Sequence, residues 1–294
     1  MSTTETAATR FAGVEEWPVE DMVGAMVEGQ MAAAASLQAV AGAIASAIEA
    51  AVPRLQAGGR LIWLGAGTSG RIAVQDAAEL LPTFGWPPER ARAVMAGGEA
   101  ALLRAVEGAE DDGPAAIAAL QALGLTASDV VIGVAASGRT PFTVAGVEHA
   151  RGIGALTIGL FNNPGGALGA VCAHPVLLRT GAEIVAGSTR MKAGTAQKAA
   201  LNILSTGIFL RLGHVWRGRM VEMAPTNAKL RQRAVEMVAE LADVPRGRAE
   251  AALDEGGTIK HAIVMLARDA SAPEAARLLD ENAGRLHLAL NAPD

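Results

Sequence analysis

The chain has 294 residues, a formal net charge of −5, 51% hydrophobic residues and only 3% aromatic residues. That length suits one large domain with a small appendage, and aliphatic side chains must fill most of the core because aromatic residues are scarce. The acidic balance argues against a broad surface for nucleic acid or anionic membranes. An anion site would therefore have to be assembled locally, from backbone N–H groups and a few basic residues.

Cysteine content and the start of the sequence indicate a compartment. Cys172 is the only cysteine, so neither an intrachain disulfide nor a thiolate zinc cluster can form. Residues 1–22 are polar and acidic and lack the basic and apolar regions of a signal peptide. No apolar run approaches the length of a spanning helix, which is roughly 20 residues. These features predict a cytoplasmic protein without membrane or nucleic-acid partners.

Short apolar runs alternate with longer amphipathic stretches along most of the chain. Residues 20–56 are Ala-rich, with no internal Pro until Pro53, and predict one or two helices. The apolar runs that follow predict strands at residues 60–66, 92–97, 129–135, 155–162 and 174–180. The amphipathic stretches predict helices at residues 70–81, 99–109, 113–123, 140–152 and 189–213.

Strands separated by helices imply parallel βαβ units with right-handed crossovers. The strands are almost continuously apolar, as expected when helices cover both faces of the sheet. We therefore predict an α/β fold with a doubly wound, flavodoxin-like parallel sheet over residues 51–225. An N-terminal helical segment at 1–50 precedes it, and a small C-terminal helical domain at 226–294 follows. Short helices in this last domain are expected near residues 246–254, 258–268 and 272–281.

The segment LGAGTSGR, residues 64–71, has the Gly65-x-Gly67-x-x-Gly70 spacing of dinucleotide-binding proteins. A dinucleotide site also needs an acidic residue about 20 positions later, at the end of the second strand. That interval instead reads WPPERARAV, and Glu99 comes considerably later. The segment also lacks the Lys followed by Ser or Thr of a Walker loop. Its glycines therefore favour a compact phosphate monoester over a nucleotide cofactor.

Two further loops repeat this chemistry: AASGRTP after the predicted strand 129–135, and AGSTRMKAGT before the helix 189–213. Doubly wound sheets bind ligands beyond the carboxyl ends of their strands, where the first N–H groups of a helix attract phosphate. Any one loop could be only a tight turn with a helix cap. Three such loops at one sheet edge predict a phosphate site that includes Thr68, Ser69, Gly70, Ser137, Gly138, Ser188 and Thr189.

Two carboxylates occupy unusual positions. Glu79 lies near the C-terminal end of the predicted helix 70–81, where the helix dipole disfavours a negative charge. Glu110 is surrounded by Glu107, Asp111 and Asp112. Crowded carboxylates hold a proton more tightly, which keeps an acid protonated near neutrality. From spacing alone, Glu79 could equally be an exposed helix position and the acidic run a solvated loop.

Six segments in the same order resemble one known family. They are LGAGTSGR, PTFG, AGGEAALLRAVEGAEDD, DVVIGVAASGRTP, GSTRMKAGTAQKAALNILSTG and TNAKLRQRAV, between about residues 58 and 240. Together they resemble the N-acetylmuramic acid 6-phosphate etherases, which have the sugar isomerase (phosphosugar-binding) domain. The resemblance implies that water replaces the lactyl ether at C3 of the amino sugar by elimination and hydration. The implied products are N-acetylglucosamine 6-phosphate and D-lactate.

The resemblance also implies site residues. The family's catalytic glutamates fall on Glu79, as the acid that assists lactate departure, and on Glu110, as the base at C2, although the two roles could be exchanged. Thr140 joins the predicted phosphate site. Lys192 could add charge there or be an ordinary surface lysine, and Glu183 is a further possible site residue. The resemblance implies neither metal nor cofactor.

A homodimer is expected for two reasons. In the family the resemblance points to, the active site is built at a dimer interface. The Ala-rich N-terminal helices also present a broad apolar face that a second subunit would bury, unless they pack within their own chain.

The chain departs from the family pattern in its N-terminal segment, which keeps little of that pattern beyond TE, and in three other places. It has AAELLPT at 77–83 where the family usually has ASECPPT, GAE at 181–183 for GPE, and FNNP at 161–164 for SCNP. The change at 77–83 puts the pocket near the lactyl group in doubt. Two alternatives therefore stay open: a non-catalytic sugar-phosphate sensor like the related glucokinase regulators, or a phosphosugar aldose–ketose isomerase. Retention of Glu79 and Glu110 disfavours the sensor, and an isomerase has no use for an acid at the C3 oxygen.

Overall fold

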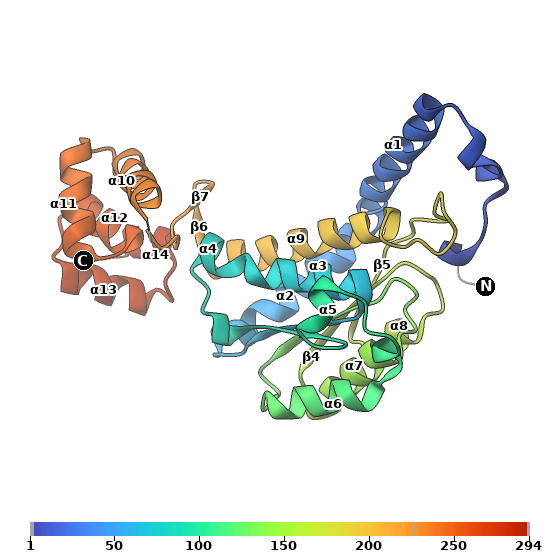
Figure 1. The fold of residues 1–294 in the computed structure, drawn as a ribbon. Helices are drawn as coiled ribbons and strands as arrows, with labels where there is room; N and C mark the ends of the chain where they lie inside the picture. Colours follow the sequence, from blue (N-terminus) through green and yellow to red (C-terminus); the bar gives the residue numbers. More distant parts are fainter. Residues whose placement is uncertain (1–2, 226, 293–294) are drawn as a thin grey trace. The chain divides into compact units, whose positions relative to one another are not determined.

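The computed structural model describes residues 3–225 and 227–292 (Figure 1). The chain forms two compact units. We call them the sheet unit, Met1–Ala78 with Pro88–Gly207, and the helical unit, Glu79–Pro87 with Ile208–Asp294. The domain boundaries expected from the sequence at residues 50 and 225 remain predictions. Thr226, the first residue of the TNAKLRQRAV segment, lies outside the described residues.

The sheet unit contains a five-stranded parallel sheet with the strand order β2-β1-β3-β4-β5. This is the flavodoxin-like order, so the predicted doubly wound α/β fold is confirmed. Every residue of β1, β3 and β4 is buried, whereas the edge strand β2 is partly exposed. The strands are β1 Leu61–Gly65, β2 Ala91–Met95, β3 Val130–Val134, β4 Leu156–Phe161 and β5 His174–Leu177.

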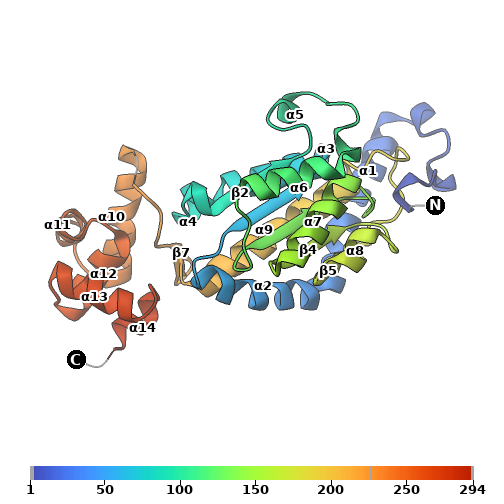
Figure 2. The same cartoon turned by 90° about the horizontal axis from the view of Figure 1, so that it is seen from below.

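Helices cover both faces of the sheet (Figures 1 and 2). One face carries α2 Ala41–Gln56, α3 Gly67–Ala78 and α9 Lys192–Leu212. The other carries α6 Gly113–Ala122, α7 Pro141–Ile153 and α8 Ala167–Val171. Alternate strand residues supply the second face with apolar side chains, and Ile62, Leu64 and Val131 pack there against Leu120, Val147 and Leu168.

The predicted N-terminal helical stretch consists of two helices, α1 Val19–Ala35 and α2. By length and composition alone, the described stretch Val19–Gln56 could cross a membrane. It is interrupted after Ala35, however, and α2 buries Ile44, Ala47 and Leu55 within the sheet unit. A single helix of this kind is weak evidence for a membrane span.

One predicted helix is wrong. Residues 99–109 form only the short α5 Ala100–Leu103, followed by a loop and a 3-10 turn at Ala109–Asp111. The helix ends where Arg104 takes an extended conformation, and Gly108, with positive φ, leaves the helical path again further on. Leu103 is 96% exposed, so the apolar spacing that suggested a helix has no surface to pack against.

The helical unit confirms the three short helices predicted near its end, as α11 Arg246–Gly256, α12 Ile259–Arg268 and α13 Ala272–Glu281. Their starts follow ordinary capping chemistry: Thr258 accepts from the N–H of His261, and Ser271 and Glu274 form a capping box. This unit also contains the helices α4 Leu80–Phe84, α10 Ala228–Ala242 and α14 Leu286–Leu290. It further contains a hairpin of β6 Val215–Trp216 and β7 Arg219–Met220, and this hairpin was not predicted from the sequence.

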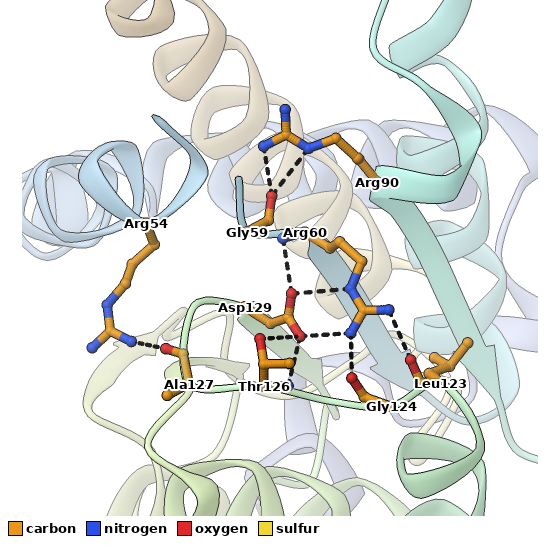
Figure 3. Close-up of polar contacts among 9 residues, drawn as sticks. All are labelled: Arg54, Gly59, Arg60, Arg90, Leu123, Gly124, Thr126, Ala127 and Asp129. Atoms are coloured by element: carbon orange, nitrogen blue, oxygen red, sulfur yellow. Dashed lines mark hydrogen bonds and ion pairs between the residues drawn. The ribbon is translucent and has the colours of Figure 1, made fainter. Parts of the chain in front are cut away.

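A polar network fastens the amino ends of β1 and β3 (Figure 3). The Arg60 guanidinium donates to the nearly fully buried Asp129 carboxylate, with Nη2 2.7 Å from Oδ2. The N–H of Thr126 donates to the same oxygen at 2.8 Å. Burial raises the pKa of Asp129, but the hydrogen bonds from Arg60 and Thr126 outweigh it and hold that pKa below its usual value. These contacts therefore stabilise the amino ends of β1 and β3.

Candidate functional site

A pocket of about 440 Å³ lies at the carboxyl ends of β1 and β3. The strand order reverses between these two strands. This is where doubly wound sheets bind ligands. The lining residues come from five parts of the chain: Glu5; Ala66, Gly67, Thr68 and Ser69; Glu110 and Asp111; Ala136, Ser137, Arg139, Thr140 and Pro141; and Gly187 and Thr189.

The structure therefore brings the three loops expected from the sequence to one cavity. Of the predicted phosphate-binding residues, Thr68, Ser69, Ser137, Thr140 and Thr189 line it. Gly70, Gly138 and Ser188 belong to the same loops but are not part of the lining.

The first loop leads directly into α3, whose first turn forms one wall of the pocket. The first hydrogen bond of this helix runs from the N–H of Gly70 to the oxygen of Ala66, at 3.0 Å. The N–H groups of Gly67, Thr68 and Ser69 thus come before the ladder begins and can bind an anion. A Cβ on Gly70 would lie 2.8 Å from the oxygen of Gly65, so only glycine lets α3 start this close to β1.

The hydroxyl of Ser69 is already engaged behind the pocket. Its Oγ donates to Oε1 of Gln197 at 2.9 Å, and Nε2 of Gln197 donates to Oδ1 of Asn162 at 2.9 Å. Because a serine hydroxyl carries one hydrogen, Ser69 has only its backbone N–H left to donate to a ligand. Asn162 is one of the positions where the chain departs from the family pattern, and here it orients Gln197.

The second loop supplies hydroxyls and a cation. The N–H of Arg139 donates to Oγ of Ser137 at 3.1 Å, which closes a tight turn. Gly138 has φ +67°, and a Cβ there would lie 3.1 Å from Cα of Gly166. Thr140 precedes Pro141, the first residue of α7. Arg139 is the only basic side chain among the described lining residues.

The third loop contributes Gly187 and Thr189, whereas Lys192 and Glu183 lie elsewhere. Lys192 begins α9, and its N–H donates to Oε2 of Glu183 at 3.0 Å. The N–H of Ala193 donates to Oε1 of the same carboxylate at 2.9 Å. Glu183 is 1% exposed, so it caps the positive end of α9 from inside the unit and holds the third loop in place.

One predicted carboxylate lies in the pocket. Glu110 lines it together with Asp111, and both belong to the 3-10 turn Ala109–Asp111. The neighbouring Asp112 instead caps α6, where Oδ1 accepts from the N–H of Ala115 at 2.9 Å. The crowded acidic run thus divides into a carboxylate pair at the pocket and a structural cap.

Comparisons with known proteins identify the family of the chain. Residues 43–151 match the glucokinase regulatory protein N-terminal SIS domain. The chain is 48% identical over 282 residues to N-acetylmuramic acid 6-phosphate etherase of Deinococcus radiodurans, covering 96% of this chain and 92% of that protein. It is 41% identical over 290 residues to the protein of the same name from Halalkalibacterium halodurans, covering 98% and 97%.

The chain belongs to the N-acetylmuramic acid 6-phosphate etherase family. Its sheet unit also resembles a phosphoheptose isomerase from Francisella tularensis, with a TM-score of 0.51 and 24% identity over 66% of this chain and all of that one. At that identity the likeness concerns the fold alone.

The second carboxylate implied by the etherase resemblance is not in this pocket. Glu79 is exposed and directly follows Ala78, the last residue of α3. Ser69, in the first turn of that helix, lines the pocket. Ala78 lies nine residues further along α3, which places it about 14 Å from Ser69 along the helix axis. Glu79 is not among the lining residues, and neither are the altered positions Ala78, Leu80 and Leu81.

Three charged lining residues were not among the site residues predicted from the sequence: Glu5, Asp111 and Arg139. Asp111 and Arg139 lay inside segments already singled out, so a charged residue beside each candidate was a usable signal. Glu5 belongs to the TE that the N-terminal segment shares with the family, but its place at the pocket depends on contacts of Thr3 and Thr4 with Asn163, about 160 positions away.

Proposed function

We propose that the protein cleaves the D-lactyl ether of N-acetylmuramic acid 6-phosphate, giving N-acetylglucosamine 6-phosphate and D-lactate. The observation that carries this proposal is the pocket itself. In a chain of the etherase family, one cavity combines the first N–H groups of α3, hydroxyls from three loops and the Glu110 carboxylate. A phosphate bound at the loops would leave the sugar within reach of an acid–base group.

The phosphate would be held by the N–H groups of Gly67, Thr68 and Ser69, together with the hydroxyls of Thr68 and Ser137. Thr140 and Thr189 extend this hydroxyl surface. Arg139 supplies the positive charge that a substrate with a phosphate and a lactyl carboxylate requires.

Glu110 would then act as the base. In the open-chain sugar the C1 aldehyde acidifies the C2 proton, and the Glu110 carboxylate accepts it. The C3–O bond breaks with its electron pair passing to the lactyl oxygen, which takes a proton from a second carboxylic acid. A C2=C3 double bond results. Water adds at C3, assisted by the same second group as base, and a proton returns to C2.

We assign that second group to Glu79, which requires a homodimer. Since Glu79 does not line the pocket of its own chain, a second copy would have to bring its own Glu79 there. A surface that could hold two copies together lies on α1: Val19, Val23, Val27 and Met31 recur every four residues and are 70%, 47%, 53% and 69% exposed. We place this dimer in the cytoplasm, in keeping with the single cysteine.

Isotopic labelling tests the proposal. The protein should release D-lactate from N-acetylmuramic acid 6-phosphate. In deuterium oxide the sugar product should carry deuterium at C2, and in heavy-oxygen water it should carry the label at C3 while lactate stays unlabelled. Glu79→Ala should still exchange the C2 proton without releasing lactate. An isomerase would exchange C2 and release no lactate even as the unaltered protein, and a sensor would bind the sugar phosphate without either reaction.

A further inference from the structure

The first residues of the chain are built into the pocket. Thr4 is fully buried, and its carbonyl oxygen accepts from the N–H of Gly187 in the third loop at 2.9 Å. Its N–H donates to Oδ1 of Asn163 at 3.2 Å, and Nδ2 of Asn163 donates to Oγ1 of Thr4 at 2.9 Å. Asn163, itself fully buried, also donates to the oxygen of Ala136 in the second loop at 2.9 Å. The segment Thr3–Glu5 is thus tied to two of the three ligand-binding loops.

These ties place Glu5 at the pocket, where it is a lining residue. Its carboxylate lies close over the backbone of Gly187, with Oε2 2.7 Å from the position that a Cβ on Gly187 would take. Any other residue at 187 would therefore push Glu5 away. Gly187 also has φ +77°, a conformation that favours glycine. The contacts of Thr4 thus hold Glu5 at the pocket, and the glycine at position 187 of the third loop leaves space for its carboxylate.

The charge of Glu5 works against phosphate binding, because two negative groups in one cavity repel each other. An ionised carboxylate only accepts hydrogen bonds, so it needs donors. Within the part of the chain that the structure describes, no hydrogen bond or ion pair engages the Glu5 side chain. The donors of an amino sugar phosphate are its hydroxyls and its amide N–H, and they lie away from the phosphate oxygens.

We propose that Glu5 is a substrate-binding residue that accepts a hydrogen bond from a hydroxyl or the amide N–H of the sugar. The segment Thr3–Glu5 thereby forms a wall of the substrate site. This inference rests on the proposed function only in taking an amino sugar phosphate as the ligand. It assigns Glu5 to the neutral part of that ligand and leaves the phosphate to the loops.

Glu5→Ala should change the affinity for the sugar phosphate and the affinity for inorganic phosphate in opposite directions. Titration calorimetry should show the Kd for N-acetylglucosamine 6-phosphate rising about tenfold or more, the effect of losing a hydrogen bond to a charged group. The Kd for inorganic phosphate should stay the same or fall, because a repelling charge is gone. Glu5→Gln keeps one carbonyl acceptor and should give an intermediate loss for the sugar phosphate.

Two further variants separate contact from folding. Glu15→Ala removes another exposed glutamate that is not part of the pocket, and it should leave both Kd values unchanged. Thr4→Val keeps the shape of the anchor but deletes the hydroxyl that accepts from Asn163, so it should weaken the sugar phosphate while the protein stays folded by circular dichroism.

An unchanged Kd for the sugar phosphate in Glu5→Ala would overturn the inference. Equal weakening of the sugar phosphate and inorganic phosphate would overturn it too, since Glu5 would then only hold the phosphate loops in place. Failure of the proposed function would look different: the unaltered protein would release no lactate, whatever Glu5→Ala does to binding.

Discussion

Ser69 and Thr68 are adjacent in the pocket wall, but the structure gives their hydroxyls different work. The Ser69 hydroxyl donates its hydrogen to Gln197, whereas Thr68 lines the pocket from the first turn of α3. We therefore expect Ser69→Ala to lower stability and leave phosphate binding largely intact. Thr68→Val should do the reverse, and each variant serves as the control for the other.

The size of the Ser69→Ala effect follows from what it leaves behind. Gln197 is 1% exposed, so water cannot replace the lost donor at its Oε1. A buried acceptor without a partner costs about 2 kcal/mol, which for a unit of this size lowers Tm by about 4–8 °C. The N–H of Ser69 remains, so the Kd for inorganic phosphate should change less than about threefold.

Thr68→Val removes a hydroxyl that can donate to a charged ligand and keeps the shape of the side chain. The loss should raise the Kd for phosphate by about tenfold or more, while the free energy of unfolding changes by less than about 0.5 kcal/mol. Thermal unfolding and phosphate titration on both variants provide the test. A Ser69→Ala protein with an unchanged Tm and a tenfold weaker phosphate site would refute this division of roles.

Three further predictions concern residues outside the pocket lining that support the fold or the proposed dimer. Asp129→Asn should lower the free energy of unfolding by about 3 kcal/mol at neutral pH, because it leaves Arg60 without its buried partner. The folded pKa of Asp129 lies below its unfolded value of about 3.9, so this contribution is present above that value and is lost as pH falls through the folded pKa. The gap between wild type and Asp129→Asn in urea unfolding should therefore shrink at acid pH, and a constant gap would contradict the pairing. Gly70→Ala should lower Tm and weaken phosphate binding together, since its Cβ would press on the oxygen of Gly65; unchanged phosphate affinity would mean that α3 tolerates a shift. Val27→Asp should convert the dimer into monomers in sedimentation experiments and abolish lactate release, and an active monomer would exclude a shared site.

Much of the fold could be predicted from sequence because it depends on local patterns. Buried parallel strands must be apolar along their whole length, which is why β1, β3 and β4 were recognisable. The helices of the helical unit begin at residues with ordinary capping chemistry, Thr258 and Ser271, which is also a local pattern. The helix predicted at 99–109 was wrong because its apolar side chains have little to pack against: Leu103 is 96% exposed, and the backbone becomes extended at Arg104.

The part of the candidate site that follows from the sheet topology could be predicted from the sequence. The carboxyl ends of parallel strands share one edge, so loops at 66–69 and 136–140 had to meet there. Roles that depend on contacts distant in sequence could not be foreseen. Ser69 meets Gln197 across 128 positions, and Asn163 holds Thr4 across 159. The same limit applies to Glu79, whose proposed role requires a second chain.

Lactate release by Glu110→Gln tests the central claim most directly, because Glu110 is the carboxylate that the pocket places beside the phosphate-binding groups. The variant keeps the size of the side chain and cannot accept the C2 proton. We predict that kcat falls by about 10²–10⁴ while N-acetylglucosamine 6-phosphate binds within about threefold of wild type. Glu107→Gln, a neighbouring acid outside the pocket lining, should retain full activity. A Glu110→Gln protein that releases lactate at more than about a tenth of the wild-type rate would contradict the account.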